Sequence, residues 1–165
     1  MKCRVRSQKQ LDKLRSDAVH RYSPISITAM LTVCESKLHF GNEKIRKAAK
    51  EISNSYDSIS KHYISFEDLK ECLHDYDGVQ VPFDFEHKQS YDTIDDAEAL
   101  AAYAQKAFAC AVLCTVLCDK FGFRTVKAQQ AVNQVCDSSD HLEDNRRALN
   151  EQKTHFLKKY GVLIS

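Results

Sequence analysis

The sequence predicts an all-α fold, in which two tandem-duplicated helical units of about three to four helices each pack as a pseudo-twofold bundle around a central helix over residues 94–121. Three observations predict this fold. Residues 107–114 are consecutively apolar, and a helix that is apolar on nearly all sides is a buried helix. The 165 residues include only four Gly and two Pro, too few for the turns of an all-β protein. The third observation is an internal repeat.

The repeat is found by shifting the sequence 83 positions, which aligns residues 9–82 with residues 92–165 without a gap. Apolar residues stay in register, as Ile52 and Val135 do, and chance seldom keeps such a register over this length. The predicted organisation is therefore a single compact domain over residues 1–165, with unit one at 9–82, unit two at 92–165 and a connecting strap at 79–91.

The first unit begins with a predicted polar helix over residues 9–22. Ser23 and Pro24 are expected to end it, because proline cannot continue a helix but suits a first turn that a serine caps. A second helix is predicted over residues 25–38, and a turn through Gly41 follows it.

Two more helices complete the first unit. One is predicted over residues 42–55, with an inner stripe at helical spacing. The stripe consists of Ile45, Ala48, Ala49, Ile52 and Tyr56. The other helix is predicted to begin at Ser65, where Asp68 completes a cap, and to end at Gly78. Residues 79–91 alternate apolar and polar side chains, which favours an extended crossing strap over a short strand.

The second unit differs at its start. Ala107 stands where Pro24 stands in the first unit, so its two leading helices are predicted to fuse into the central helix over residues 94–121. Thr93 and Asp96 form the pattern of a capping box at the beginning of this helix.

The following helix of the second unit has an inner stripe of its own, which consists of Ala128, Ala131, Val132 and Val135. Asp140 with Glu143 is expected to cap the last helix. Gly161 is expected to end it, because glycine readily adopts the left-handed conformation of a helix stop.

The charge is balanced overall but uneven along the chain. The net charge is +1, whereas residues 1–50 carry a net +8 and residues 67–98 a net −9. Such regions either solvate the surface or steer a charged partner. Seven Cys, an odd number, and the lack of an apolar stretch after Met1 favour a reducing cytoplasm, here that of a host cell. No membrane partner is expected, because the uninterrupted apolar run is shorter than the about 18 residues that span a bilayer.

The sequence predicts no enzyme, no cofactor and no metal site. Cys110, Cys114 and Cys118 lie four residues apart on one helical face, an arrangement that cannot surround a tetrahedral ion, so they are predicted to line a helix contact. No Gly-rich phosphate loop and no nucleophile motif occurs.

Two basic clusters are the candidate binding residues, because clustered Lys and Arg suit phosphate contacts. They consist of Arg4, Arg6, Lys9 and Lys13 near the start of the chain and of Lys44, Arg46, Lys47 and Lys50 on the helix over residues 42–55. Aromatic residues are not interleaved with them along the sequence, so stacking on single-stranded bases is not expected.

The chain resembles a family of small helical proteins encoded by phages and prophages, which carry an F-G-F-G turn, an S-I segment, a Y-V-S-x-E-D-L motif and a T-G before an apolar tail. The matching segments are Asp119 to Phe123, Ser58-Ile59, Tyr63 to Leu69 and Gly78-Val79. Arg124 replaces the last Gly of the turn, and the Y-V-S-x-E-D-L motif is lost after Leu142. The resemblance implies a mobile-element accessory protein that acts on host machinery.

The first functional hypothesis is therefore a non-catalytic phage-type protein that binds a host protein, for example to inhibit an antiviral defence nuclease in the manner of an anti-CRISPR protein. The second is a nucleic-acid-binding accessory or regulatory protein that uses the basic helical faces. A metal-dependent enzyme is the third. The sequence leaves the oligomeric state and the identity of the partner open.

Overall fold

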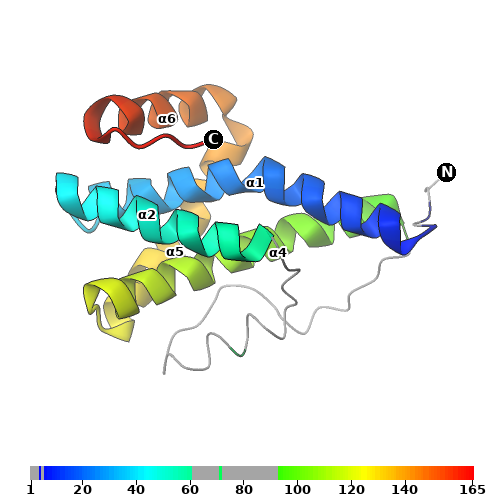
Figure 1. Ribbon diagram of the computed structural model, residues 1–165, viewed down its shortest axis with the longest axis horizontal. Coiled ribbons are helices and arrows are strands. Elements are labelled where there is room, and N and C mark those ends of the chain that lie inside the picture. Colours follow the sequence, from blue (N-terminus) through cyan, green and yellow to red (C-terminus); the bar gives the residue numbers. More distant parts are fainter. Residues whose placement is uncertain (1–3, 5, 61–70, 72–92) are drawn as a thin grey trace.

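The computed structural model describes residues 4, 6–60, 71 and 93–165, and this part of the chain is helical (Figure 1). Its elements are α1 (Gln8–Ser36), α2 (Asn42–Ser60), α4 (Ile94–Thr115) with the π-helical turn η1 (Val116–Lys120), α5 (Thr125–Asp144) and α6 (Arg146–Tyr160). The all-α prediction is confirmed. The predicted helix from Ser65 to Gly78, apart from Glu71, and most of the strap lie outside the described residues.

The helix formed by α4 and η1 lies at the centre of the bundle, where it contacts α1, α2 and α5 (Figure 1). Each residue from 107 to 114 is at most 5% exposed. The inner stripes predicted for α2 and α5 are buried in the same core. Thr93 caps this helix as predicted, with the Asp96 amide donating to Thr93 Oγ1 at 3.1 Å, while the Thr93 hydroxyl donates to the Asp96 carboxylate at 2.5 Å. The buried central helix is thus confirmed.

One helical stretch in the described part, Ile94–Lys120, is long and apolar enough to cross a membrane by length and composition alone. It was not expected from the uninterrupted apolar run, which is shorter; the stretch meets the condition because an 18-residue window within it holds at most two charged residues. In this structure 56% of its most apolar window is buried against other helices, as expected of a core helix.

The predicted helix break at Ser23 and Pro24 is wrong, because α1 continues through both residues. Proline costs a helix about 3 kcal/mol through a lost backbone hydrogen bond and a clash with the preceding turn. On either side of the proline, Ser23 Oγ donates to the Val19 carbonyl at 2.5 Å and Thr28 Oγ1 donates to the Pro24 carbonyl at 2.6 Å, which adds side-chain hydrogen bonds to this part of the helix. The residues that follow, Ile25 to Cys34, are mostly buried, so packing outweighs the local cost.

The predicted cap at Asp140 and Glu143 is also wrong. Both residues lie inside α5, and their carboxylates accept hydrogen bonds or ion pairs from Lys106 Nζ on α4, at 3.1 and 2.8 Å. The helix instead ends at Asn145, whose side-chain oxygen accepts from the Ala148 amide at 3.0 Å and caps α6. Gly161 ends α6 with a φ of 68°, as predicted.

Candidate functional site

Two interhelical turns meet at one end of the bundle and bring three phenylalanines together. Phe40 follows α1, whereas Phe121 and Phe123 follow η1. The ring centroid of Phe40 lies 4.8 Å from that of Phe121 and 5.8 Å from that of Phe123. Phe40 is buried, and the other two rings are half-buried. These rings form an aromatic platform under the surface of this end.

Lysine side chains lie over each ring of the platform. Lys44 Nζ is 5.6 Å from the centroid of Phe40, Lys47 Nζ is 4.9 Å from that of Phe121, and Lys127 Nζ is 4.7 Å from that of Phe123. Ammonium groups are attracted to aromatic faces at such distances, by about 0.5–1 kcal/mol at exposed sites.

The structure brings aromatic and basic residues together, although they are not interleaved along the sequence. Two of the rings and one of the lysines come from the second half of the chain. The rings are partly covered by the lysines, so the expectation that bases do not stack on them stands as a prediction.

Eight exposed cations lie on the two segments that carry the aromatic platform, residues 37–50 and 120–127, and we call this surface the basic end. They are Lys37, Lys44, Arg46, Lys47, Lys50, Lys120, Arg124 and Lys127. One of them, Arg46, donates through Nε to the Tyr160 carbonyl at 2.9 Å. Three carboxylates lie near these cations along the chain: Glu43 and Glu51 on α2, and Asp119 in η1. The Glu51 carboxylate is 3.7 Å from Lys120 Nζ. Lys47 Nζ also donates to the Lys120 carbonyl at 2.9 Å, which ties α2 to the second turn. The basic end carries an excess of positive charge on a firmly packed support.

The structure separates the two predicted basic clusters. All eight candidate residues are exposed, but Arg4, Arg6, Lys9 and Lys13 lie where α1 begins, and Lys44, Arg46, Lys47 and Lys50 lie where α2 begins (Figure 1). Between Lys13 and the end of α1 at Ser36 the helix rises by about 35 Å. The first cluster therefore does not join the second in one surface, whereas Lys120, Arg124 and Lys127 do. These three were not among the predicted binding residues, although the 83-residue shift places Phe40 opposite Phe123.

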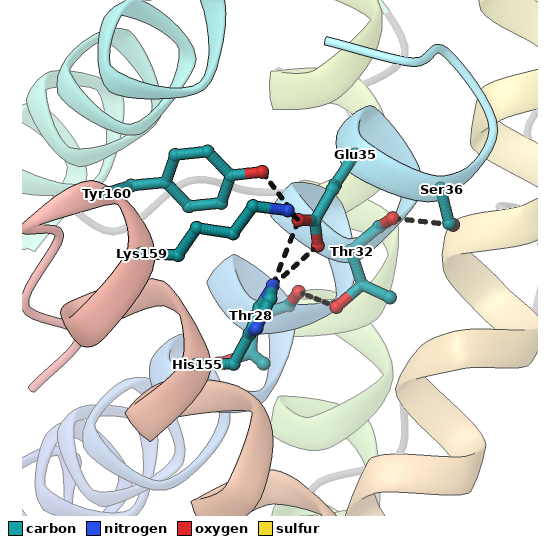
Figure 2. A network of polar contacts seen from close by, with 7 residues as sticks. All are labelled: Thr28, Thr32, Glu35, Ser36, His155, Lys159 and Tyr160. Atoms are coloured by element: carbon teal, nitrogen blue, oxygen red, sulfur yellow. Dashed lines mark hydrogen bonds and ion pairs between the residues drawn. The ribbon is translucent and has the colours of Figure 1, made fainter. Parts of the chain in front are cut away.

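A polar network adjoins the basic end and joins the last turn of α1 to α6 (Figure 2). The Glu35 carboxylate accepts from Tyr160 Oη at 2.5 Å and from Lys159 Nζ at 2.9 Å, and it lies 2.9 Å from His155 Nε2. Partial burial works to raise the pKa of Glu35, but the hydrogen bonds from Lys159, Tyr160 and His155 together lower it to about 2. Nothing in the sequence pointed to this network, because its members are about 120 residues apart.

Glu35 is expected to make the protein less stable in acid. Its folded-state pKa is below its unfolded value, so its contribution is complete above pH 4.5 and is lost as the pH falls towards about 2. With a fifth of the side chain exposed, the contribution is about 1–2 kcal/mol after solvent screening. Urea unfolding at pH 6 and pH 3 should show that Glu35→Gln loses this part of the pH dependence. The control Glu43→Gln, at an exposed position on α2, should keep it.

The described residues contain no group of three or more His, Cys, Asp or Glu side chains that could hold a metal ion. Cys110 and Cys114 are fully buried and Cys118 partly so, which confirms that this cysteine row lines helix contacts. An open groove of about 300 Å³ lies between the first halves of α1 and α4. Its lining combines apolar residues such as Leu14 and Ala18 with three carboxylates and one cation, which are Asp17, Asp95, Glu98 and Arg21.

Comparisons with known proteins add no relative. The chain matches no protein-family model, no curated protein and no solved structure. The candidate site therefore has to be judged on its own geometry.

Proposed function

We propose that this protein is a non-catalytic accessory protein of a mobile element, that it acts by binding, and that the basic end is its contact surface, with nucleic acid as the partner. The observation that carries the proposal is the placement of three lysines over a packed aromatic platform, on segments of the chain that carry five further exposed cations. Phosphate groups need clustered Lys and Arg donors, and such contacts supply most of non-specific affinity.

The platform supports this function through preorganisation. A lysine held over an aromatic ring has less rotamer freedom to lose when it meets a phosphate. Lys44, Lys47 and Lys127 are positioned in this way before any partner binds. The contacts available here are to the phosphate backbone, so the proposed binding depends little on base sequence.

The experiment is a titration of a fluorescently labelled DNA duplex with the full chain, followed by anisotropy over a series of salt concentrations. The logarithm of the binding constant should fall linearly with the logarithm of salt, with a slope of about −0.9 for each phosphate neutralised. A slope near zero, or no binding at low salt, would contradict the proposal.

A host protein remains the second candidate partner. The Lys120–Phe123 segment, which carries part of the resemblance to phage proteins, lies at the basic end, where Lys120 is exposed and Phe123 is partly exposed. An acidic face of a host protein would complement the charge of this surface. A defence nuclease that the protein inhibits is one example of such a host protein. Affinity capture from host lysate should then recover one protein that variants of the basic end lose.

We also propose that the two halves are a tandem duplication with a pseudo-twofold relation. Equivalent turn bonds support it: the Phe40 amide donates to the Cys34 carbonyl and the Phe123 amide to the Leu117 carbonyl, both at 3.0 Å. These pairs are 83 residues apart. His39 and Gly122, also equivalent, both adopt a positive φ, of 53° and 67°.

The equivalence of the turns leads to a stability prediction. Gly122→Ala should lower the free energy of unfolding by about 1 kcal/mol, because an L residue is strained at this φ while no atom lies within 4 Å of the added Cβ. His39→Gly should raise it by about 0.5 kcal/mol, the relief of strain being partly offset by unfolded-state entropy. Urea unfolding measures both. The two substitutions are expected to change stability in opposite directions, so a loss of stability in both variants would contradict the prediction.

A further inference from the structure

Two thiols from facing helices lie almost in contact in the core. Cys110 Sγ on α4 is 3.5 Å from Cys136 Sγ on α5. Cys110 is fully buried, whereas Cys136 is partly exposed. Both are free thiols, and neither has a role in the basic end. A disulfide has its sulfur atoms about 2.05 Å apart, so a small movement would allow the bond.

The register of the two helices keeps the thiols together. Lys106, one turn before Cys110, binds Asp140 and Glu143 at 3.1 and 2.8 Å, and Asp140 lies one turn after Cys136. Glu143 also accepts from Tyr22 Oη on α1 at 3.0 Å. This polar layer connects α1, α4 and α5 next to the thiols and holds α4 antiparallel to α5 in the register that pairs them.

We propose that Cys110 and Cys136 are a redox site, which a small-molecule disulfide such as oxidised glutathione converts reversibly to an intramolecular disulfide between α4 and α5. The two thiols have different parts in the exchange. The partly exposed Cys136 is the attacking residue, and the buried Cys110 is the resolving residue.

The chemistry follows from the hydrogen bond between them. The bond from the Cys110 thiol lowers the pKa of Cys136, whereas the same bond and burial raise the pKa of Cys110. The Cys136 thiolate attacks one sulfur of oxidised glutathione, and the first glutathione leaves as a thiolate. Cys110 then attacks Cys136 Sγ in the mixed disulfide and releases the second glutathione, which takes up its proton. Two protein thiols are oxidised, and one glutathione disulfide is reduced to two thiols.

The disulfide would stabilise the core. It closes a loop between positions 26 residues apart, which restricts the unfolded chain. For a chain of this size we expect the melting temperature to rise by roughly 5–10 °C. Reduction by excess glutathione should return it to the original value.

The experiment treats the full native chain with oxidised glutathione, blocks the remaining thiols and digests with trypsin. We expect a linked pair of peptides, residues 107–120 and 128–146, that separates on reduction. Because the first peptide also contains Cys114 and Cys118, single Ser variants of these two should keep the link. Cys110→Ser should abolish the link and leave Cys136 joined to glutathione.

Two results would overturn the proposal. One is a Cys136 that forms the glutathione adduct in the wild-type chain but never the linked peptides. The other is a link that persists in Cys110→Ser. Should the buried Cys110→Ser substitution impair folding, Cys136→Ser at the partly exposed position gives the same comparison, with loss of both the link and the rise in melting temperature expected.

Discussion

Phe156→Ala should lower the free energy of unfolding by about 4 kcal/mol, since truncation of a buried Phe costs about 3–5 kcal/mol in lost burial and a residual cavity. Phe156 lies on α6 with 0% exposure. Its ring stacks on that of Tyr160, with centroids 5.8 Å apart, and the same Tyr160 donates to Glu35. Loss of the ring should therefore weaken the attachment of α6 to the bundle. Urea unfolding followed by circular dichroism measures the change, because the chain has no Trp.

The adjacent residue supplies a matched control. Leu157 on the same turn of α6 is 47% exposed, so Leu157→Ala should cost less than about 1 kcal/mol. Equal losses in the two variants would mean that α6 does not present this face to the core. A small loss in both would mean that α6 contributes little to the bundle.

The parts of the fold that depend on periodicity could be predicted from the sequence. The stripes of α2 and α5 are buried because apolar residues at helical spacing lie on one face of each helix, and that face packs against the core. The end of α6 was also predictable from a local feature, because Gly161 adopts the left-handed conformation that stops a helix. The errors arose where a local signal competed with packing. Pro24 is held inside α1 by the buried residues that follow it, and Asp140, which looked like a cap, pairs instead with Lys106 across to α4.

The candidate site was predictable only in part. Lys44 lies four residues after Phe40, a spacing at which side chains meet on or near a helix, so that pair was within reach of sequence reasoning. The approach of Phe121 to Phe40 and of Lys47 to Phe121 depends on how α1, α2 and η1 cross. The network around Glu35 depends on where α6 docks. No local pattern encodes these distances.

Lys44→Glu combined with Lys47→Glu should weaken DNA binding by about 100-fold near physiological salt, the second large effect that we expect. Each substitution removes a phosphate contact and adds a repulsive charge, and each lost contact should make the salt slope shallower by about 0.9. Both side chains are exposed on α2, so the variant should fold, apart from a loss of about 1–2 kcal/mol from the contacts with Phe40 and Phe121. Anisotropy titrations with circular dichroism as the folding check provide both measurements.

Lys9→Glu combined with Lys13→Glu is the matched control, because it reverses the same number of charges on an exposed face at the far end of α1. Both variants change the net charge of the chain equally, so an effect of overall charge would weaken DNA binding alike in the two. A contact surface confined to the basic end predicts instead that the control keeps the wild-type salt slope. If the salt slope of the control became as shallow as that of Lys44→Glu with Lys47→Glu, the DNA would have to contact the whole length of α1 or its opposite end. That result would contradict the proposal that the basic end is the binding site.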